Sequence, residues 1–205
     1  MTFGGFEIGR LYSRRSEIHS RFNGQQQGGI STPVEHPVIF LFTGDSGTQH
    51  GYSDGWEGGV FHYFGEGQTG DMQWRMGNLA IREHSANGKD LLLFDTGKKG
   101  GPVRFVGQFS CAGFRYQKAP DRTGKIRQAI VFELVAEGKG GPTPDAIESL
   151  APITSASLWS LREKAKQASR PSPTKSSKEA IRSYVERSEA VRVYVLARAS
   201  GICEN

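Results

Sequence analysis

Residues 51–81 read GYSDGWEGGVFHYFGEGQTGDMQWRMGNLAI, and this stretch has the most unusual composition of the chain. Glycine and aromatic residues are interspersed through it. Such a pattern disfavours a helix and interrupts a strand, because each glycine adds backbone freedom that folding must remove. Within it, residues 60–64 (VFHYF) predict a strand that places Phe61 and Tyr63 on one face and His62 and Phe64 on the other. A loop-rich segment that carries so many ring side chains is typical of a binding site.

The segments around this stretch predict strands for the most part. Residues 37–43 (PVIFLFT) form an unbroken apolar run, which favours a strand buried on both faces. Further strands are expected at 91–94, 103–116 and 128–135, the last two joined by the turn sequence PDRTGK. A brief helix capped by Asn78 is expected over 78–84. The fold class indicated is α+β, mainly β, with a curved sheet or partly closed barrel and a few short helices.

A cluster of helix and strand breakers, GKGGPTPD at 138–145, marks a domain boundary. We therefore expect a main domain over residues 1–137, a linker over 138–176 with a short helix at 155–168, and a final helix over 177–205. That last helix begins with the capping-box pattern from Ser176 to Glu179. The main domain would thus be followed by a helical C-terminal linker.

The net charge of +5 lies entirely in residues 159–205, because the preceding residues carry equal numbers of acidic and basic side chains. Any nucleic-acid contact of the main domain must therefore come from basic residues gathered on one face. The two cysteines, Cys111 and Cys203, make no disulfide framework. Neither a signal peptide nor a membrane-spanning apolar run is evident, so a cytoplasmic protein without membrane contact is expected.

The titratable residues give little indication of catalysis. The five histidines lack the close spacing of a zinc site or a hydrolytic triad, so no catalytic and no metal-binding residues are predicted in this chain. Because active sites can be assembled from distant residues, a metal-dependent nuclease or a base-processing hydrolase using Asp54, His62 or His84 stays open. A general RNA-binding or single-strand-binding barrel is a further alternative, since stacking tolerates any base.

The residue types of the central stretch suit a nucleobase, which offers two π faces and one hydrogen-bonding edge. Tyr52 and Tyr63 could face each other as stacking plates, and Asp54 between them could accept a hydrogen bond from an exocyclic amino group. Cytosine and adenine carry that amino group, whereas thymine carries a carbonyl there. The other residues included in the predicted base-binding site are Ser53, Trp56, Glu57 and Phe64. A purely structural role for the aromatic residues in the core is the alternative.

The order of QQQGGI, an apolar strand, GYSDGWEGG, VFHYFGEG, GNLAI, VRFVGQF, GFRYQK and AIVFELV resembles the SET- and RING-associated domain, the SRA or YDG family of modified-cytosine readers. The resemblance covers about residues 6–136. It implies a crescent-like β-barrel that flips 5-methylcytosine or 5-hydroxymethylcytosine out of double-stranded DNA. Tyr52 and Tyr63 would stack on the base and Asp54 would read its amino edge, without a cofactor in this chain.

The sequence departs from the family at two places. Phe64 stands where the family carries threonine, and the acidic loop is one residue shorter, so that Glu57 could replace Asp54 as the reader. The family's thumb loop, which fills the gap left by the base, corresponds to Gln25, Gln26 and Gln27. Its finger loop corresponds to 94–102 or to 120–127. The basic residues expected to contact DNA are Arg21, Lys98, Lys99, Lys118, Arg122 and Lys125.

The tail SEAVRVYVLARASGICEN resembles the lead-in to an HNH nuclease module, with Cys203 as the first zinc ligand of a pair whose second member would follow the end of the sequence. This resemblance implies the recognition part of a type IV modification-dependent restriction endonuclease, truncated where its HNH module starts. Zinc and a divalent metal would belong to the missing nuclease. The apolar faces of the C-terminal helices suggest a partner, either a second copy in a homodimer or that nuclease.

Overall fold

The computed structural model describes residues 2–44, 54–97, 100–137 and 155–199. Its main element is a sheet with the strand order β4-β5-β8-β9-β10-β7-β6, in which β3 and β11 also pair with β9. The ladders β5–β8 and β9–β11 are parallel, and the other described ladders are antiparallel. The strands of this sheet are β3 (Leu11–Tyr12), β4 (Ile30–Ser31), β5 (Val38–Thr43), β6 (Gly55–Glu57), β7 (Val60–Phe64), β8 (Asp90–Asp95), β9 (Val103–Pro120), β10 (Ile126–Ala136) and β11 (Ser172–Pro173).

Few helices accompany the sheet, as expected. A π-helical segment, η1 (Arg14–His19), continues into the single turn α1 (Ser20–Phe22), and a short ladder joins β1 (Thr2–Phe3) to β2 (Phe6–Glu7). The remaining helices are α2 (Met76–Arg82), α3 (Ser155–Ala168) and α4 (Ser177–Ala199). Among the described helices, none is long and apolar enough to cross a membrane.

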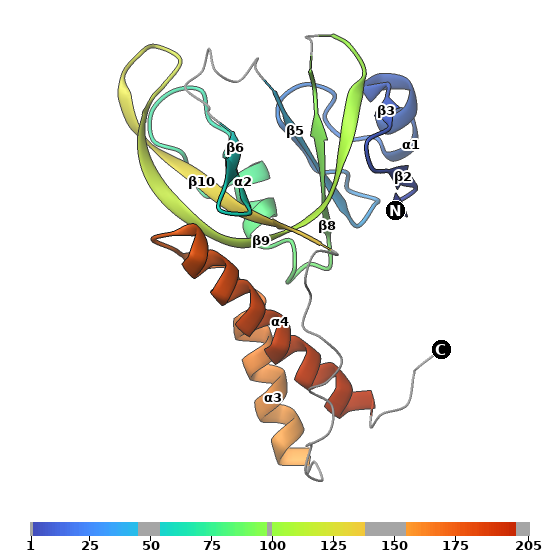
Figure 1. The fold of residues 1–205 in the computed structure, drawn as a ribbon, viewed down its shortest axis with the longest axis vertical. Coiled ribbons are helices and arrows are strands. Elements are labelled where there is room, and N and C mark those ends of the chain that lie inside the picture. The colour runs from blue at the N-terminus through green and yellow to red at the C-terminus, as the bar shows by residue number, and fades with distance from the viewer. Residues whose placement is uncertain (1, 45–53, 98–99, 138–154, 200–205) are drawn as a thin grey trace.

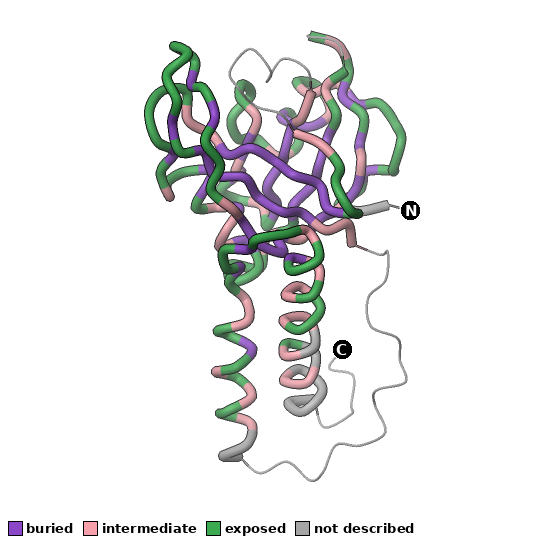
Figure 2. The backbone as a smooth tube through the Cα atoms, turned by 60° about the vertical axis from the view of Figure 1, so that its left-hand side comes forward, coloured by how far each residue is buried: buried purple, intermediate pink, exposed green. Residues whose placement is uncertain are grey.

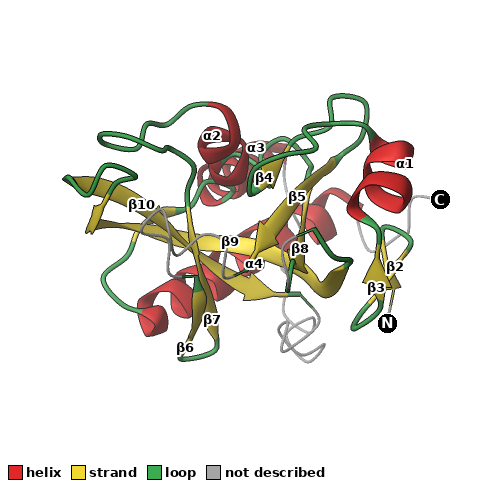
Figure 3. Cartoon of the chain, turned by 90° about the horizontal axis from the view of Figure 1, so that it is seen from above, coloured by secondary structure: helices red, strands yellow, loops and turns green. Residues whose placement is uncertain are grey.

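The expectation of a barrel is wrong, because the sheet does not close. β4 and β6 end the strand order, and no described ladder joins them. β9 pairs with β8 from Arg104 to Phe109 and with β10 from Phe109 to Pro120. The neighbours of β9 therefore diverge into two parts, here called the β8 arm (β8, β5, β4) and the β10 arm (β10, β7, β6). Seen from above, the two arms lie on opposite sides of the centre of β9 (Figure 3).

The predicted strand at 37–43 is confirmed as β5, and it is buried on both faces. Ile39 and Leu41 belong to one hydrophobic cluster, which also contains Tyr63 of β7. Phe40 and Phe42 belong to a second cluster, centred on the N-terminal segment. Strand alternation thus divides one apolar run between two cores. Figure 2 shows the buried residues concentrated along the strands of the sheet.

Two of the three predicted helices form where they were predicted to start, and the predicted end of the last one, at 205, lies outside the described residues. α3 spans Ser155–Ala168, and α4 begins at Ser177 with the Ser176 hydroxyl accepting the Glu179 backbone N–H at 3.3 Å. The third helix forms, but its predicted cap is wrong. Asn78 lies inside α2 and not at its N-terminus, and its side chain bonds to the preceding loop instead.

The C-terminal segment 155–199, here called the helical arm, docks on the outer face of the sheet. α3 and α4 lie side by side beneath the strands (Figures 1 and 2). Between them, β11 adds to β9, with Ser172 opposite Gly113. Arg187 of α4 donates to the Cys111 carbonyl at 3.1 Å, and Arg170 lies 2.8 Å from the Glu83 carboxylate. Backbone pairing and charge-assisted contacts together hold the helical arm on the domain.

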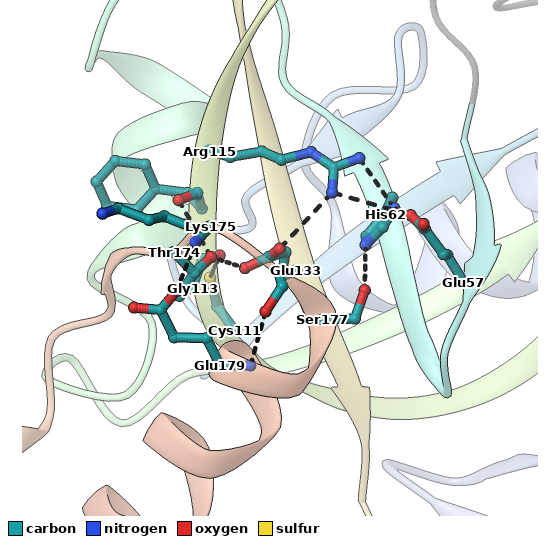
Figure 4. A network of polar contacts seen from close by, with 12 residues as sticks. Glu57, His62, Cys111, Gly113, Arg115, Glu133, Thr174, Lys175, Ser177 and Glu179 are labelled. Carbon is teal, nitrogen blue, oxygen red and sulfur yellow. Dashed lines mark hydrogen bonds and ion pairs between the residues drawn. The ribbon is translucent and has the colours of Figure 1, made fainter.

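A buried carboxylate, Glu133 of β10, lies at this junction (Figure 4). Its Oε2 accepts the Thr174 hydroxyl of the helical arm, and its Oε1 lies 3.8 Å from Arg115. The approach of Thr174 requires the glycine at position 113, since a Cβ there would lie 2.6 Å from the Thr174 methyl group. Burial raises the pKa of Glu133 to about 7, with Arg115 acting in the opposite direction. The folded state therefore favours the protonated acid.

We expect Glu133→Gln to stabilise the protein at pH 8 but not at pH 4. The raised pKa of Glu133 makes a stabilising contribution that is complete below the ordinary value of 4.5 and is lost as the pH rises to about 7. At about 1.4 kcal/mol per pKa unit, the gain at pH 8 is at most about 3 kcal/mol. Urea unfolding across this pH range measures it, with Glu35→Gln on the exposed surface as the control. If the difference in unfolding free energy between Glu133→Gln and the unchanged protein were the same at every pH, the raised pKa of Glu133 would be contradicted.

Candidate functional site

A cavity of about 830 Å³ lies between the two arms of the sheet. The β8 arm contributes Ile30, Phe42 and Thr43 to its wall, and the β10 arm contributes Tyr63 and Phe64. The rest of the wall comes from Arg14, residues 25 and 27–29, Gly44, Asp54, residues 65–69, residues 71–73, Arg75, Met76, Asn78 and Thr96. The unusual sequence stretch thus supplies much of one cavity, together with segments distant in sequence.

Asp54, immediately before β6, points its carboxylate into this wall. Oδ1 accepts the backbone N–H of Phe64 at 2.8 Å, and Oδ2 accepts the hydroxyl of Thr43 at 2.8 Å. Burial raises the pKa of Asp54, and these two hydrogen bonds act in the opposite direction. A carboxylate offers about four acceptor positions, so two donors leave capacity for a ligand donor. The group is both fixed in place and able to bind.

Tyr63 lines the same cavity from β7 and is 2% exposed. Its hydroxyl donates to the Gly29 carbonyl at 2.7 Å, which joins the β10 arm to the loop that precedes β4. The site requires glycine at position 29, because a Cβ there would lie 2.7 Å from the Tyr63 hydroxyl oxygen. Burial raises the pKa of Tyr63 well above its ordinary value, so the phenol stays neutral.

The glutamine loop reaches the cavity in part. Gln25 and Gln27 line it, and Gln25 donates to the Gln27 carbonyl at 2.6 Å, whereas Gln26 is exposed and lies outside the lining. Arg14 anchors this loop, since its guanidinium donates to the Gly28 carbonyl at 2.8 Å and lies 3.7 Å from the centre of the Phe42 ring. Burial lowers the pKa of Arg14.

The remaining predicted base-binding residues lie elsewhere or outside the described part. Trp56 is 56% exposed and packs edge-on against Phe61, away from the cavity lining. Glu57 lies 3.2 Å from His62 on the outer face, in a second hollow that Asp54 also lines. Phe64 is buried and lines both hollows, and it shares the second hollow with His62, which lies on the face predicted for it. Tyr52 and Ser53 lie outside the described residues.

The predicted DNA-contacting residues divide into two places. The β9–β10 hairpin carries three of them, all exposed: Lys118, Arg122 and Lys125. The hairpin contacts the loop between β7 and α2, because Arg122 donates to the Gln68 side chain at 3.0 Å. Arg21 lies over the Phe6 and Phe22 rings, and it does not line the cavity. Lys98 and Lys99 lie outside the described residues.

The loop between β7 and α2 lies in the stretch that the sequence singled out, but none of its residues was predicted individually as part of the site. Asn78 organises this loop: its Oδ1 accepts the Glu66 backbone N–H at 2.8 Å, and its Nδ2 donates to the Glu66 and Gln73 carbonyls at 2.9 Å each. Asn78 among glycines was a sequence signal, but its propensity for helix caps led to the wrong interpretation. Of the basic residues near the start of the chain, Arg21 was selected as a DNA contact, whereas Arg14 is the one that lines the cavity.

The histidines of the open enzyme hypothesis have structural partners. His84 accepts the Cys111 N–H at 3.1 Å, while its second ring nitrogen lies 2.9 Å from the Lys89 carbonyl. Its pKa is lowered by burial, which favours a neutral ring. His62 contacts Glu57, Arg115 and the Ser177 hydroxyl on the outer face. Within the described ranges, no three histidine, cysteine, aspartate or glutamate side chains gather as they would around a metal ion.

The sequence matches the family model described as "ScoMcrA-like, SRA domain" over residues 8–146. This chain belongs to the ScoMcrA-like SRA domain family. The resemblance inferred from the sequence is thereby confirmed at the level of the family, and residues 54–78 of the cavity wall lie inside the matched range. Comparison of this SRA-family chain with curated proteins gives no match.

Solved structures are similar to this SRA-family chain in fold. "Sulfur binding domain and SRA domain of ScoMcrA complexed with phosphorothioated DNA" aligns with TM-score 0.52 and 22% identity, over 64% of this chain and 40% of that one. "Structure of the Type IV phosphorothioation-dependent restriction endonuclease ScoMcrA" aligns with TM-score 0.50 and 18% identity, over 98% and 48%. "Crystal structure of SUVH5 SRA- hemi methylated CG DNA complex" aligns with TM-score 0.50 and 20% identity, over 70% and 97%. This chain therefore spans less than half the length of the two ScoMcrA chains.

We expect Gly29→Ala and Tyr63→Phe to be strongly coupled in the stability of this SRA domain. Gly29→Ala alone should cost about 1–3 kcal/mol by overpacking against the Tyr63 hydroxyl, and Tyr63→Phe alone about 0.5–1.5 kcal/mol for the lost hydrogen bond. The double variant lacks the Tyr63 hydroxyl oxygen that clashes with the added Cβ. Its loss of stability should therefore be smaller than the sum of the two single losses by about 1 kcal/mol.

Urea unfolding of the four proteins measures this coupling. Additive costs would show that the contact between Tyr63 and Gly29 does not limit the packing at this point.

Proposed function

We propose that this chain binds double-stranded DNA containing 5-methylcytosine or 5-hydroxymethylcytosine and holds the modified base, flipped out of the duplex, in the cavity between the two arms. In this proposal it is the recognition part of a type IV modification-dependent restriction endonuclease. The observation that carries the proposal is the Asp54 carboxylate, fixed by two donors in the cavity wall close to Tyr63.

In the proposal, Asp54 determines which hydrogen-bonding edge of a base the cavity prefers. An ionised Asp54 accepts hydrogen bonds only, so it suits the exocyclic amino group of cytosine and disfavours the carbonyl of thymine. Thr43 and the Phe64 backbone hold the carboxylate in one orientation before a base arrives. The entropic cost of ordering the reader is therefore met during folding and not during binding.

Stacking would supply much of the free energy of capture. Extruding a base costs a few kcal/mol, and stacking on an aromatic ring returns about 1–3 kcal/mol. Tyr63 offers a ring in the cavity wall, held by its hydrogen bond to Gly29. In the proposal Tyr52 is the opposite plate, and Gln25 or Gln27 of the thumb loop pairs with the guanine left without its partner.

The relatives give the proposal its class of ligand. The similar structures are described as a ScoMcrA fragment with phosphorothioated DNA and a SUVH5 SRA domain with hemimethylated CG DNA. A further SUVH5 SRA structure is described as bound to fully hydroxymethylated CG DNA. The exposed Lys118, Arg122 and Lys125 beside the cavity would contact phosphates in a salt-dependent way.

We expect Asp54→Asn to remove the preference for modified DNA while leaving weak, salt-sensitive binding. Asparagine keeps an acceptor for the Phe64 N–H, but its amide nitrogen would face the donor group of cytosine. The loss of a hydrogen bond to a charged acceptor corresponds to about tenfold to a hundredfold in affinity. Gel shifts at fixed salt with unmodified, methylated and hydroxymethylated duplexes measure this.

The matched control is Glu57→Gln, which changes the other candidate acid on the outer face. It should leave the preference unchanged. The opposite pattern, loss with Glu57→Gln and none with Asp54→Asn, would transfer the reading role to Glu57. Unchanged discrimination in both variants would refute base reading by either acid.

A further inference from the structure

The helix α3 presents a basic face to solvent. Arg162 and Lys166 are both exposed, and their spacing of four residues places them on one side of the helix. Trp159 precedes Arg162 by three residues, lies on the same side and is 67% exposed. Arginine and tryptophan are enriched at binding interfaces. This face of α3 therefore has the composition of a binding surface and not only that of a solvated helix.

A single carboxylate joins this face of α3 to α2. Arg170 follows the end of α3, and its side chain is 68% exposed. The carboxylate of Glu83, at the C-cap of α2, lies 2.8 Å from the Arg170 Nε and 3.0 Å from the Arg82 Nε. The two guanidinium groups thus lie beside the same acid, and together they leave a surplus positive charge there. Figure 3 shows α2 and α3 on the same side of the molecule.

The row of basic side chains continues along α2 to the cavity. Arg82 lies over Trp74, with its guanidinium carbon 4.5 Å from the centre of the ring. Arg75, the N-cap residue of α2, is exposed and lines the cavity. Arg75 precedes Arg82 by about two helical turns, so both lie on one side of α2. The cations therefore extend from the cavity to the helical arm.

We call this row the basic track and define it as Arg75, Arg82, Arg170, Lys166 and Arg162. Two acidic residues, Glu83 and the half-buried Glu163, are interspersed with these cations, and the track keeps a positive charge. Its position agrees with the sequence, in which the net charge of +5 lies in residues 159–205. A row of cations with few acids attracts a polyanion, because the separate electrostatic interactions add along the row.

The spacing of the basic track suits the phosphates of duplex DNA. The helical rise of about 1.5 Å per residue places Arg162 and Lys166 about 6 Å apart along α3, and Arg170, just beyond the helix, lies about as far again. One DNA strand carries a phosphate for about each 3.4 Å of the duplex axis. These three side chains therefore extend over about four phosphates of one strand. A small anion would use only part of this row, whereas a duplex engages the whole of it.

We propose that the basic track is a second DNA-contact surface, along which duplex DNA flanking the modified base is held against α2 and the helical arm. The inference rests on the proposed function, because that function brings the duplex to the cavity where the track begins. It adds contacts to phosphates, which are independent of sequence and of base modification. The part of the track on α3 lies beyond residues 8–146, to which the SRA domain model matches. In this inference the helical arm binds DNA itself.

The test compares Lys166→Glu with the unchanged full chain on methylated duplexes of about 10 and about 30 base pairs, which are about one and three helical turns long. The new carboxylate would lie one turn from Arg162 and from Arg170 and pair with either cation, so the helical arm would lose most of the charge of the track. We expect binding of the long duplex to weaken by about tenfold at low salt, with a shallower dependence of affinity on salt concentration. Binding of the short duplex, which also reports correct folding, should change by less than about twofold.

Lys164→Glu is the matched control, because it makes the same change of charge at an exposed position of the same helix. Lys164 is two residues from Arg162 and from Lys166 and therefore does not share their side of α3. It should leave binding of both duplexes within about twofold of the unchanged protein. Equal weakening by Lys166→Glu and Lys164→Glu would show an effect of net charge alone and would overturn the inference.

The remaining outcomes separate the basic track from the proposed function. If Lys166→Glu left binding of the long duplex unaffected while methylated and unmodified duplexes were still distinguished, the track would be refuted and the proposed function would stand. If Lys166→Glu changed only the self-association of the DNA-free chain in sedimentation, this face would be an interface between copies, and the inference would fail. Failure of the unchanged protein to distinguish methylated from unmodified duplexes would overturn the proposed function, whereas the comparison of Lys166→Glu with Lys164→Glu on the long duplex would still decide on the track.

Discussion

The pairing of β9 with different strands along its two halves is the constraint on which the site depends. β8 pairs with the first half of β9 and β10 with its second half, and no described ladder joins the arms that they begin. Side-chain hydrogen bonds join the arms instead, among them Thr43 of the β8 arm with Asp54 and Tyr63 of the β10 arm with Gly29. Two of the residues proposed to bind the base, Asp54 and Tyr63, therefore also connect the two arms. The cavity exists because the sheet stays open at this point.

The sequence was informative where one local pattern decided the outcome. The apolar run of β5, the helix α3 and the start of α4 followed from periodicity and capping chemistry. Asp54 and Tyr63 both line one cavity, and their roles toward a base stay a prediction. Closure of the sheet could not be predicted in this way, because it depends on whether the strands at its two ends pair with each other. That choice is made by long-range pairing and leaves no periodic signal.

Errors at single residues had a common physical cause, namely tertiary partners that outweigh local preference. Asn78 has the propensity of a cap, yet three hydrogen bonds to the neighbouring loop place it inside α2. Arg14 and Arg21 are equivalent by composition, but one lies over Phe42 at the cavity and the other over Phe6 in the N-terminal cluster. Nothing in the sequence near either arginine distinguishes these environments. Only the packing of η1 and α1 against the sheet does so.

Several glycines are needed for close packing around the cavity and not only for turns. At Gly29, Gly65 and Gly77 an added Cβ would lie 2.7 Å or less from an atom that the site needs in place: the Tyr63 hydroxyl, the Asn78 carbonyl oxygen and the Ile30 side chain, respectively. Each of these glycines allows a backbone to approach a side chain that shapes the cavity. Gly113 does the same on the outer face, where Thr174 of the helical arm approaches Glu133. Strand β7 and its continuation lie between these two faces, with Tyr63 toward the cavity and His62 toward Ser177 of α4. A displacement of β7 would therefore displace both the cavity wall and the helical arm, because the strand is in close-packed contact with both.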